Sequence, residues 1–89
     1  MNYRIEVLPP ARKEIESLPG HVRAQARQLI RELGIDPRPS RAKELRGKPN
    51  LYRIWLATKW RIVYEVRDEQ LLILVVRVRR KTEIDYENL

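Results

Sequence analysis

Hydrophobic and polar positions alternate along residues 51–80, and this alternation predicts a run of β-strands. Tyr52, Ile54 and Leu56 are separated by other side chains, and the same period of two continues over 60–66. Residues 71–76 are apolar at every position, which is typical of a strand buried on both faces. With Asp68-Glu69 as a two-residue connection between the last two strands, the pattern predicts three consecutive antiparallel strands.

The loop around residues 58–59 determines which side chains of the first two strands share a face. A two-residue loop would pair Ala57 with Trp60 and place Arg61 beside the apolar side chains. A three-residue loop would pair Ala57 with Arg61 and separate apolar from charged residues, so we expect this register. One face would then be a core covered by helices. The other would show Arg53, Trp55, Arg61 and Glu65 around the apolar Val63, Leu72, Leu74, Val76 and Val78.

The first half of the chain predicts a strand over 2–8 and helices over 11–18 and 21–33. The second helix has apolar residues at helical spacing, and Gly34 follows it as the expected C-terminal cap. Residues 43–46 are expected to add a short edge segment. The order β-α-α-β-β-β predicts an α+β fold, a single domain over 1–89 with an antiparallel sheet and two helices packed on one face.

Composition excludes several classes of site and favours a polyanionic partner. The chain has no cysteine and one histidine, so a metal site or bound cofactor is not expected. No apolar run approaches the roughly 18 residues of a membrane span, and no signal-peptide pattern opens the chain, which favours a cytoplasmic protein. The net charge is +7, and residues 38–89 hold thirteen basic and seven acidic side chains, or +6 of it. This asymmetry favours nucleic acid or an acidic protein as partner.

The sheet face opposite the helices predicts a protein-binding surface. The segment after Val78 is short and acidic, so we expect it to leave that face uncovered. An uncovered apolar patch ringed by arginines is suited to a partner with an amphipathic, acidic helix or strand. The candidate contacts for this partner are Val63, Leu72, Leu74 and Val76.

Three short motifs resemble the RelE branch of the RelE/ParE toxins of bacterial toxin–antitoxin systems. They are Leu45-Arg46-Gly47, Tyr52-Arg53-Ile54 and Trp60-Arg61-Ile62-Val63-Tyr64, and the leading strand and helical pair match in order and length. The resemblance implies a toxin held inactive by a cognate antitoxin, which is expected to be acidic. When free, such a toxin is expected to cut messenger RNA on the ribosome without a metal or other cofactor.

The resemblance also implies a set of site residues. Arg61 would bind the scissile phosphate, helped by Arg53, by Lys81 (with Arg80 as the competing alignment) and by Tyr86. These four, Arg53, Arg61, Lys81 and Tyr86, are the candidate catalytic residues. The candidate RNA-binding residues are Arg46, Trp55, Arg79 and Arg80. The structural alternative for Arg53 and Arg61 is a cross-strand charge arrangement with Glu65.

Trp55 departs from the pattern of the ribonuclease members, which often carry a lysine at this position. The proposed general base would then be absent. Two alternative functions therefore remain open. One is a ParE-like inhibitor of DNA gyrase, and the other is a catalytically weak homologue that acts as a binding module.

Overall fold

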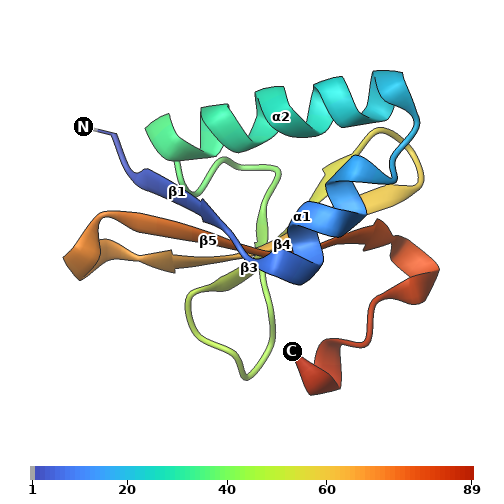
Figure 1. Ribbon diagram of the computed structural model, residues 1–89. Coiled ribbons are helices and arrows are strands. Elements are labelled where there is room, and N and C mark those ends of the chain that lie inside the picture. Colours follow the sequence, from blue (N-terminus) through green and yellow to red (C-terminus); the bar gives the residue numbers. More distant parts are fainter. Residues whose placement is uncertain (1) are drawn as a thin grey trace.

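Two helices lie across one face of a five-stranded sheet in the computed structural model, which describes residues 2–89 (Figure 1). The predicted α+β order is confirmed, including the short edge strand. The helices are α1 (Pro9–Glu16) and α2 (Gly20–Ile35), and the strands are β1 (Arg4–Val7), β2 (Lys43–Glu44), β3 (Leu51–Leu56), β4 (Trp60–Arg67) and β5 (Leu72–Arg80). Short 3-10 turns follow at Asp68–Gln70, Lys81–Glu83 and Tyr86–Asn88. No helix in residues 2–89 is long and apolar enough to cross a membrane.

The strand order across the sheet is β1-β5-β4-β3-β2. The pairs β2–β3, β3–β4 and β4–β5 are antiparallel, as the sequence predicts. The first strand departs from the expected antiparallel sheet because β1 pairs with β5 in parallel, Arg4 beside Leu72 through Val7 beside Val75. This pairing places β5 in the interior of the sheet, which explains why its sequence is apolar at consecutive positions.

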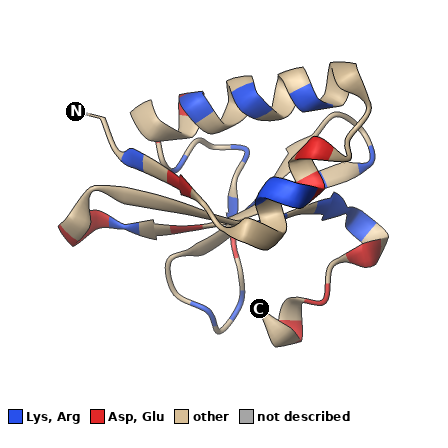
Figure 2. Ribbon diagram, in the orientation of Figure 1, with Lys and Arg blue, Asp and Glu red and all other residues tan. Residues whose placement is uncertain are grey.

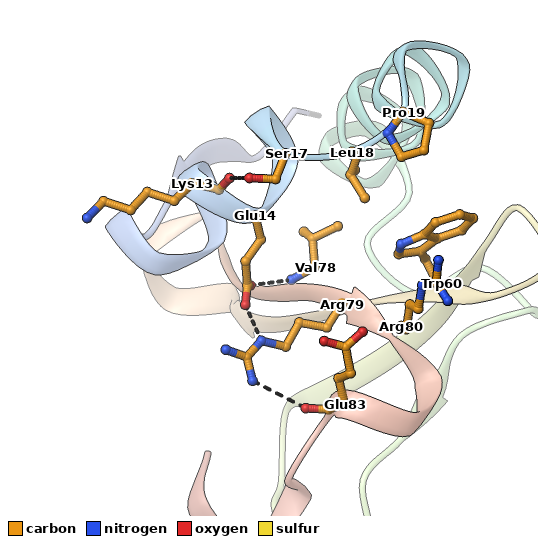
Figure 3. A pocket seen from close by; sticks show the side chains of 10 residues that line it. All are labelled: Lys13, Glu14, Ser17, Leu18, Pro19, Trp60, Val78, Arg79, Arg80 and Glu83. Carbon is orange, nitrogen blue, oxygen red and sulfur yellow. Dashed lines mark hydrogen bonds and ion pairs between the residues drawn. The ribbon is translucent and has the colours of Figure 1, made fainter.

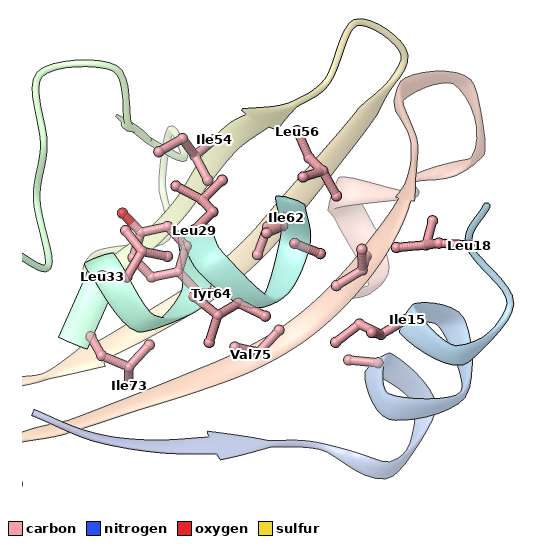
Figure 4. Packing of buried hydrophobic residues seen from close by; sticks show 14 of the residues in the cluster. Ile15, Leu18, Leu29, Leu33, Ile54, Leu56, Ile62, Tyr64, Ile73 and Val75 are labelled. Carbon is pink, nitrogen blue, oxygen red and sulfur yellow. The ribbon is translucent and has the colours of Figure 1, made fainter. Parts of the chain in front are cut away.

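The core lies between the helices and one face of the sheet. Figure 4 shows Leu29 and Leu33 of α2 packed over Tyr64 and Ile62, with Ile15 at the α1 side. Tyr64 is fully buried, and its hydroxyl donates a 2.8 Å hydrogen bond to the Pro37 carbonyl. Burial raises the pKa of the Tyr64 hydroxyl well above its ordinary value, so the side chain stays neutral.

Gly34 is a residue of α2 and not its cap, so the predicted helix end is wrong. The helix continues to Ile35 and is capped at Asp36. The Gly34 carbonyl accepts a 2.7 Å hydrogen bond from the Tyr3 amide, and a Cβ at this position would lie 3.2 Å from the Tyr3 carbonyl oxygen. The glycine is therefore explained by the close approach of α2 to the segment before β1.

Two loops differ from their predicted lengths or pairings. The β3–β4 loop has three residues, as expected, but it comprises residues 57–59 and pairs Leu56 with Trp60. Ala57 leaves the ladder with a φ of 54°, so the expected pair of Ala57 with Arg61 is wrong while the predicted segregation of faces is kept. The β4–β5 connection is longer than two residues because a 3-10 turn and Leu71, at a φ of 49°, follow Arg67.

A β-bulge in β5 changes which side chains face the core. Val63 pairs with Arg77, whereas Tyr64 pairs with Val75, so Val76 is an extra residue in β5. After this bulge Val78 pairs with Ile62 and joins the helix-side core. The prediction that Val78 lies on the opposite face is therefore wrong.

Candidate functional site

Arg61 is the buried cation of the sheet face opposite the helices in residues 2–89. It is the second residue of β4, paired with Trp55 of β3 and Arg79 of β5, and it is only 7% exposed. The guanidinium carbon lies 4.3 Å from the centroid of the Trp55 ring. One guanidinium nitrogen donates a 2.9 Å hydrogen bond to the Tyr86 hydroxyl. These contacts hold the guanidinium in one orientation.

Lys81 and Arg80 are the two candidates for the basic residue at the end of the last strand, and their side chains lie on opposite faces of the sheet. The Lys81 ammonium lies 5.7 Å from the Trp55 ring centroid and therefore belongs to the cluster around Arg61. Arg80 pairs with Trp60, and its guanidinium carbon lies 5.5 Å from that ring on the helix-covered side. Arg79 and Arg80 are consecutive residues of β5 and therefore face opposite sides of the sheet. RNA binding by Arg80 stays a prediction.

Arg53 and Arg46 line a hollow on the same face as Arg61. The hollow has a volume of about 370 Å³, and the Tyr86 ring also lines it. Arg53 neighbours Val63 in β4 and Lys43 in β2. Figure 2 shows Lys and Arg in the loop between β2 and β3 and at the end of β5, with Asp and Glu along the tail. Tyr86 therefore connects the Arg61 cluster to this hollow.

No carboxylate of residues 2–89 forms an ion pair with Arg53 or Arg61. Glu65, the expected cross-strand partner, pairs instead with Arg67 at 2.9 Å. The cross-strand charge arrangement is therefore absent from the described chain. A guanidinium fixed in place and free of a carboxylate can bind a phosphate bidentately and stabilise the charge that develops on it.

Arg79 shares a face with Arg61 but is engaged elsewhere. Its guanidinium pairs with the Glu14 carboxylate of α1 and donates a 3.2 Å hydrogen bond to the Glu83 carbonyl. The other Glu14 oxygen accepts a 3.0 Å hydrogen bond from the Val78 amide, at the edge of β5 beyond the end of β1. The sequence analysis missed Glu14, whose contacts anchor the strand end that leads to Lys81.

The predicted antitoxin-binding residues do not form an exposed patch. Val63, Leu72 and Leu74 are 0%, 4% and 7% exposed, and Val76 is half-buried. Long side chains flank Val63 in both neighbouring strands, and the hydrogen bond between Arg61 and Tyr86 holds the tail against this face. The prediction that this face is uncovered is therefore wrong. Contact of these residues with an antitoxin stays a prediction.

A polar cluster at the other end of the sheet was also missed. Arg38 pairs with Asp68 at 2.8 Å and donates a 2.7 Å hydrogen bond to the Tyr52 hydroxyl, while the Tyr3 hydroxyl donates to Asp68 at 2.6 Å. The hydrogen bonds from Arg38 and then Tyr3 lower the pKa of Asp68 to about 2. No single motif signals this cluster, because its members are up to 65 residues apart.

The described residues contain no group of three or more His, Asp or Glu side chains placed to bind a metal ion. The side chains of the Arg61 cluster carry guanidinium, ammonium and phenol groups. Such groups are suited to a nucleic-acid strand, since the fixed positive charge can bind its phosphates and a ring can stack on its bases.

The sequence is similar to that of known bacterial toxins. The family described as "ParE toxin of type II toxin-antitoxin system, parDE" matches residues 5–85. A putative RelE-like toxin protein of Escherichia coli is 36% identical over 90 residues, which cover 100% of this chain and 94% of the relative. The mRNA interferase toxin RelE of Escherichia coli K12 is 34% identical over 87 residues, covering 94% of this chain and 90% of the relative.

Solved structures of such toxins have the same fold. The isolated E. coli RelE toxin superposes with a TM-score of 0.79 at 31% identity and covers 97% of this chain and 90% of its own. The toxin in the intact E. coli RelBE toxin–antitoxin complex gives a TM-score of 0.77 at 33% identity, with 88% and 95% covered.

Proposed function

This chain belongs to the RelE/ParE superfamily of toxins from type II toxin–antitoxin systems, in its RelE-like branch, and we propose that it cuts messenger RNA on the ribosome. Such a toxin would stop translation until an antitoxin binds it.

The environment of the Arg61 guanidinium is the observation that supports the proposal most strongly. Its guanidinium is fixed by Trp55 and Tyr86, and no carboxylate neutralises it in residues 2–89. In RNA cleavage the ribose 2′-oxygen attacks the adjacent phosphorus, and the 5′-oxygen of the next nucleotide leaves. The extra negative charge of this transition state falls on the phosphate oxygens, which is where a fixed guanidinium stabilises it.

The remaining site residues take roles that follow from their positions. Lys81 adds a second positive charge beside the Trp55 ring, and Tyr86 places a hydroxyl 2.9 Å from the Arg61 guanidinium. Either can exchange a proton with the attacking or leaving oxygen. Arg53 and Arg46 lie beside Tyr86 along the adjoining hollow, where they would bind the flanking phosphates.

A protein antitoxin is the expected partner, since solved relatives of the same fold are complexes of a toxin with its antitoxin. The net charge of +7 favours an antitoxin segment rich in Asp and Glu. Binding over Arg61 or Arg53 would neutralise the charges on which cleavage depends.

Cell-free translation with the purified chain tests the proposal. Primer extension on the message should show cuts at codon positions, and adding the antitoxin should abolish them. Message that stays intact while cleaved gyrase–DNA complexes accumulate would instead support the ParE-like function. If neither is observed, the chain is a binding module and the proposal is wrong.

A further inference from the structure

A second pair of indole and guanidinium lies at the same end of the sheet, on the helix-covered face. Trp60 and Arg80 are direct partners in the β4–β5 ladder, and Arg80 lies 5.5 Å from the Trp60 ring centroid. The first pair, Trp55 and Arg61, lies on the opposite face at the adjacent position of β4. Because side chains alternate along a strand, the sheet end presents a cation beside an indole on both faces.

The Trp60–Arg80 pair opens onto a hollow of about 520 Å³ between the sheet and the turn joining α1 to α2. Figure 3 shows the Arg80 guanidinium beside the Trp60 ring, with Leu18 and Pro19 on the helix side. This volume falls within the roughly 300–1,000 Å³ typical of sites for small ligands. Lys13 and Arg80 are exposed cations beside this apolar wall, which is suited to a flat ring that carries an anionic group.

The charges in this hollow leave Arg80 available. Glu14 is engaged by Arg79 and by the Val78 amide. Arg80 forms no ion pair with any carboxylate of residues 2–89. Glu83 also lines the hollow, and its carboxylate would oppose an anion there.

Two lysines at the end of the sheet lie between its two faces. The Lys81 amide donates a 3.0 Å hydrogen bond to the Lys59 carbonyl, so these two lysines lie next to each other at the sheet end. Lys81 also reaches the Trp55 ring of the first pair. Positive charge therefore continues from the Arg61 cluster around the end of the sheet to Arg80.

We propose that the Trp60–Arg80 hollow is a second nucleotide subsite for the RNA chain that occupies the Arg61 cluster. A base stacks on the Trp60 indole while its phosphate binds the Arg80 guanidinium. This subsite rests on the proposed function, because it takes the substrate to be RNA. It lengthens the segment of single strand that the protein contacts without adding to the chemical step.

Tryptophan fluorescence tests the subsite directly, because the chain has two tryptophans. In Trp55→Phe only Trp60 remains, and a single-stranded RNA with 2′-O-methyl riboses can bind without being cut. We expect this RNA to quench the Trp60 emission. Arg80→Gln should weaken binding and reduce the slope of log affinity against log salt by about 0.7, the value for one phosphate contact on a single strand.

Two further variants sharpen the test. Arg67→Gln is the matched control, since Arg67 is an exposed arginine of the same hairpin at the far end of β4. It should leave RNA affinity and the salt slope unchanged. Glu83→Gln should raise RNA affinity, because it removes a carboxylate that lines the hollow, whereas Glu14 is paired with Arg79.

The subsite is wrong if RNA binds, as fluorescence anisotropy of a labelled strand reports, while Trp60 emission stays constant. It is also wrong if Arg80→Gln and Arg67→Gln act alike, or if only the antitoxin changes the emission. Cleavage of ribosome-bound message is measured separately. Quenching without cleavage would refute the proposed function alone, and cleavage without quenching would refute the subsite alone.

Discussion

Trp55→Leu should slow RNA cleavage with little effect on stability. Trp55 is 42% exposed, so leucine at this position of β3 removes little buried surface. What it removes is the ring that lies 4.3 Å from the Arg61 guanidinium carbon and 5.7 Å from the Lys81 ammonium. Arg61 would keep its hydrogen bond to Tyr86 but lose the stacking contact that fixes its plane.

The size of the effect follows from the exposure of the two partners. Cation–π contacts stabilise by about 0.5–1 kcal/mol when exposed and by about 2 kcal/mol when desolvated. The ring is partly exposed and Arg61 is buried, so we take about 1 kcal/mol, which is roughly a fivefold loss of rate. Trp55→Phe keeps a smaller ring and should lose less.

The assay is single-turnover cleavage of ribosome-bound message, measured beside thermal unfolding of each variant. The expected order of rates is native chain, Trp55→Phe, Trp55→Leu, at nearly equal melting temperatures. A Trp55→Leu chain that cuts at the native rate would show that stacking does not position Arg61. A chain that loses stability and activity in parallel would assign Trp55 a structural role instead.

Three other results are expected. Tyr64→Phe removes the buried hydrogen bond to Pro37 and should lower the free energy of unfolding by about 1 kcal/mol, or the melting temperature by about 4–8 °C in calorimetry. Asp68 has a pKa lowered from 3.8 to about 2, so its contribution to stability is complete above about pH 4 and is lost as the pH falls towards 2. Asp68→Asn should remove this acid dependence from pH titrations of unfolding, and an unchanged titration would contradict the Arg38–Asp68 contact. Free RNA should be cut far more slowly than ribosome-bound message, because positioning of the reacting groups supplies roughly 7–11 kcal/mol of such barriers. EDTA should have no effect on cleavage, because the residues of this site are not metal ligands. Rapid cleavage of a free oligonucleotide, or inhibition by EDTA, would disprove this.

Alternation and helical spacing predict most of the fold, because each reports directly on the side of an element that is buried. The bulge at Val76 could not be predicted in this way. Residues 71–76 are all apolar, so the period of two is not visible where the strand shifts register. The pattern therefore does not determine the face of the later residues of β5, which is why the predicted face of Val78 is wrong.

The candidate site was predictable only in part, for a related reason. Arg61 and Trp55 lie on regular strands, and their shared face follows from the register. The contacts of Glu14 and of Asp68 join segments about 64 and 30 residues apart and depend on the packed structure. The coverage of Val63 was also misjudged, because flanking long side chains bury a residue that periodicity alone assigns to the outer face.

The rate at which Arg61→Ala cuts ribosome-bound message tests the central claim most directly, with Arg67→Ala as the matched control on the same strand. If Arg61 stabilises the charged transition state, its loss should cost about 2.7–4 kcal/mol, or a factor of about 10²–10³ in rate. The control should cut at the native rate. An Arg61→Ala chain that is folded and cuts as fast as the control would contradict the assignment of Arg61 as the catalytic cation.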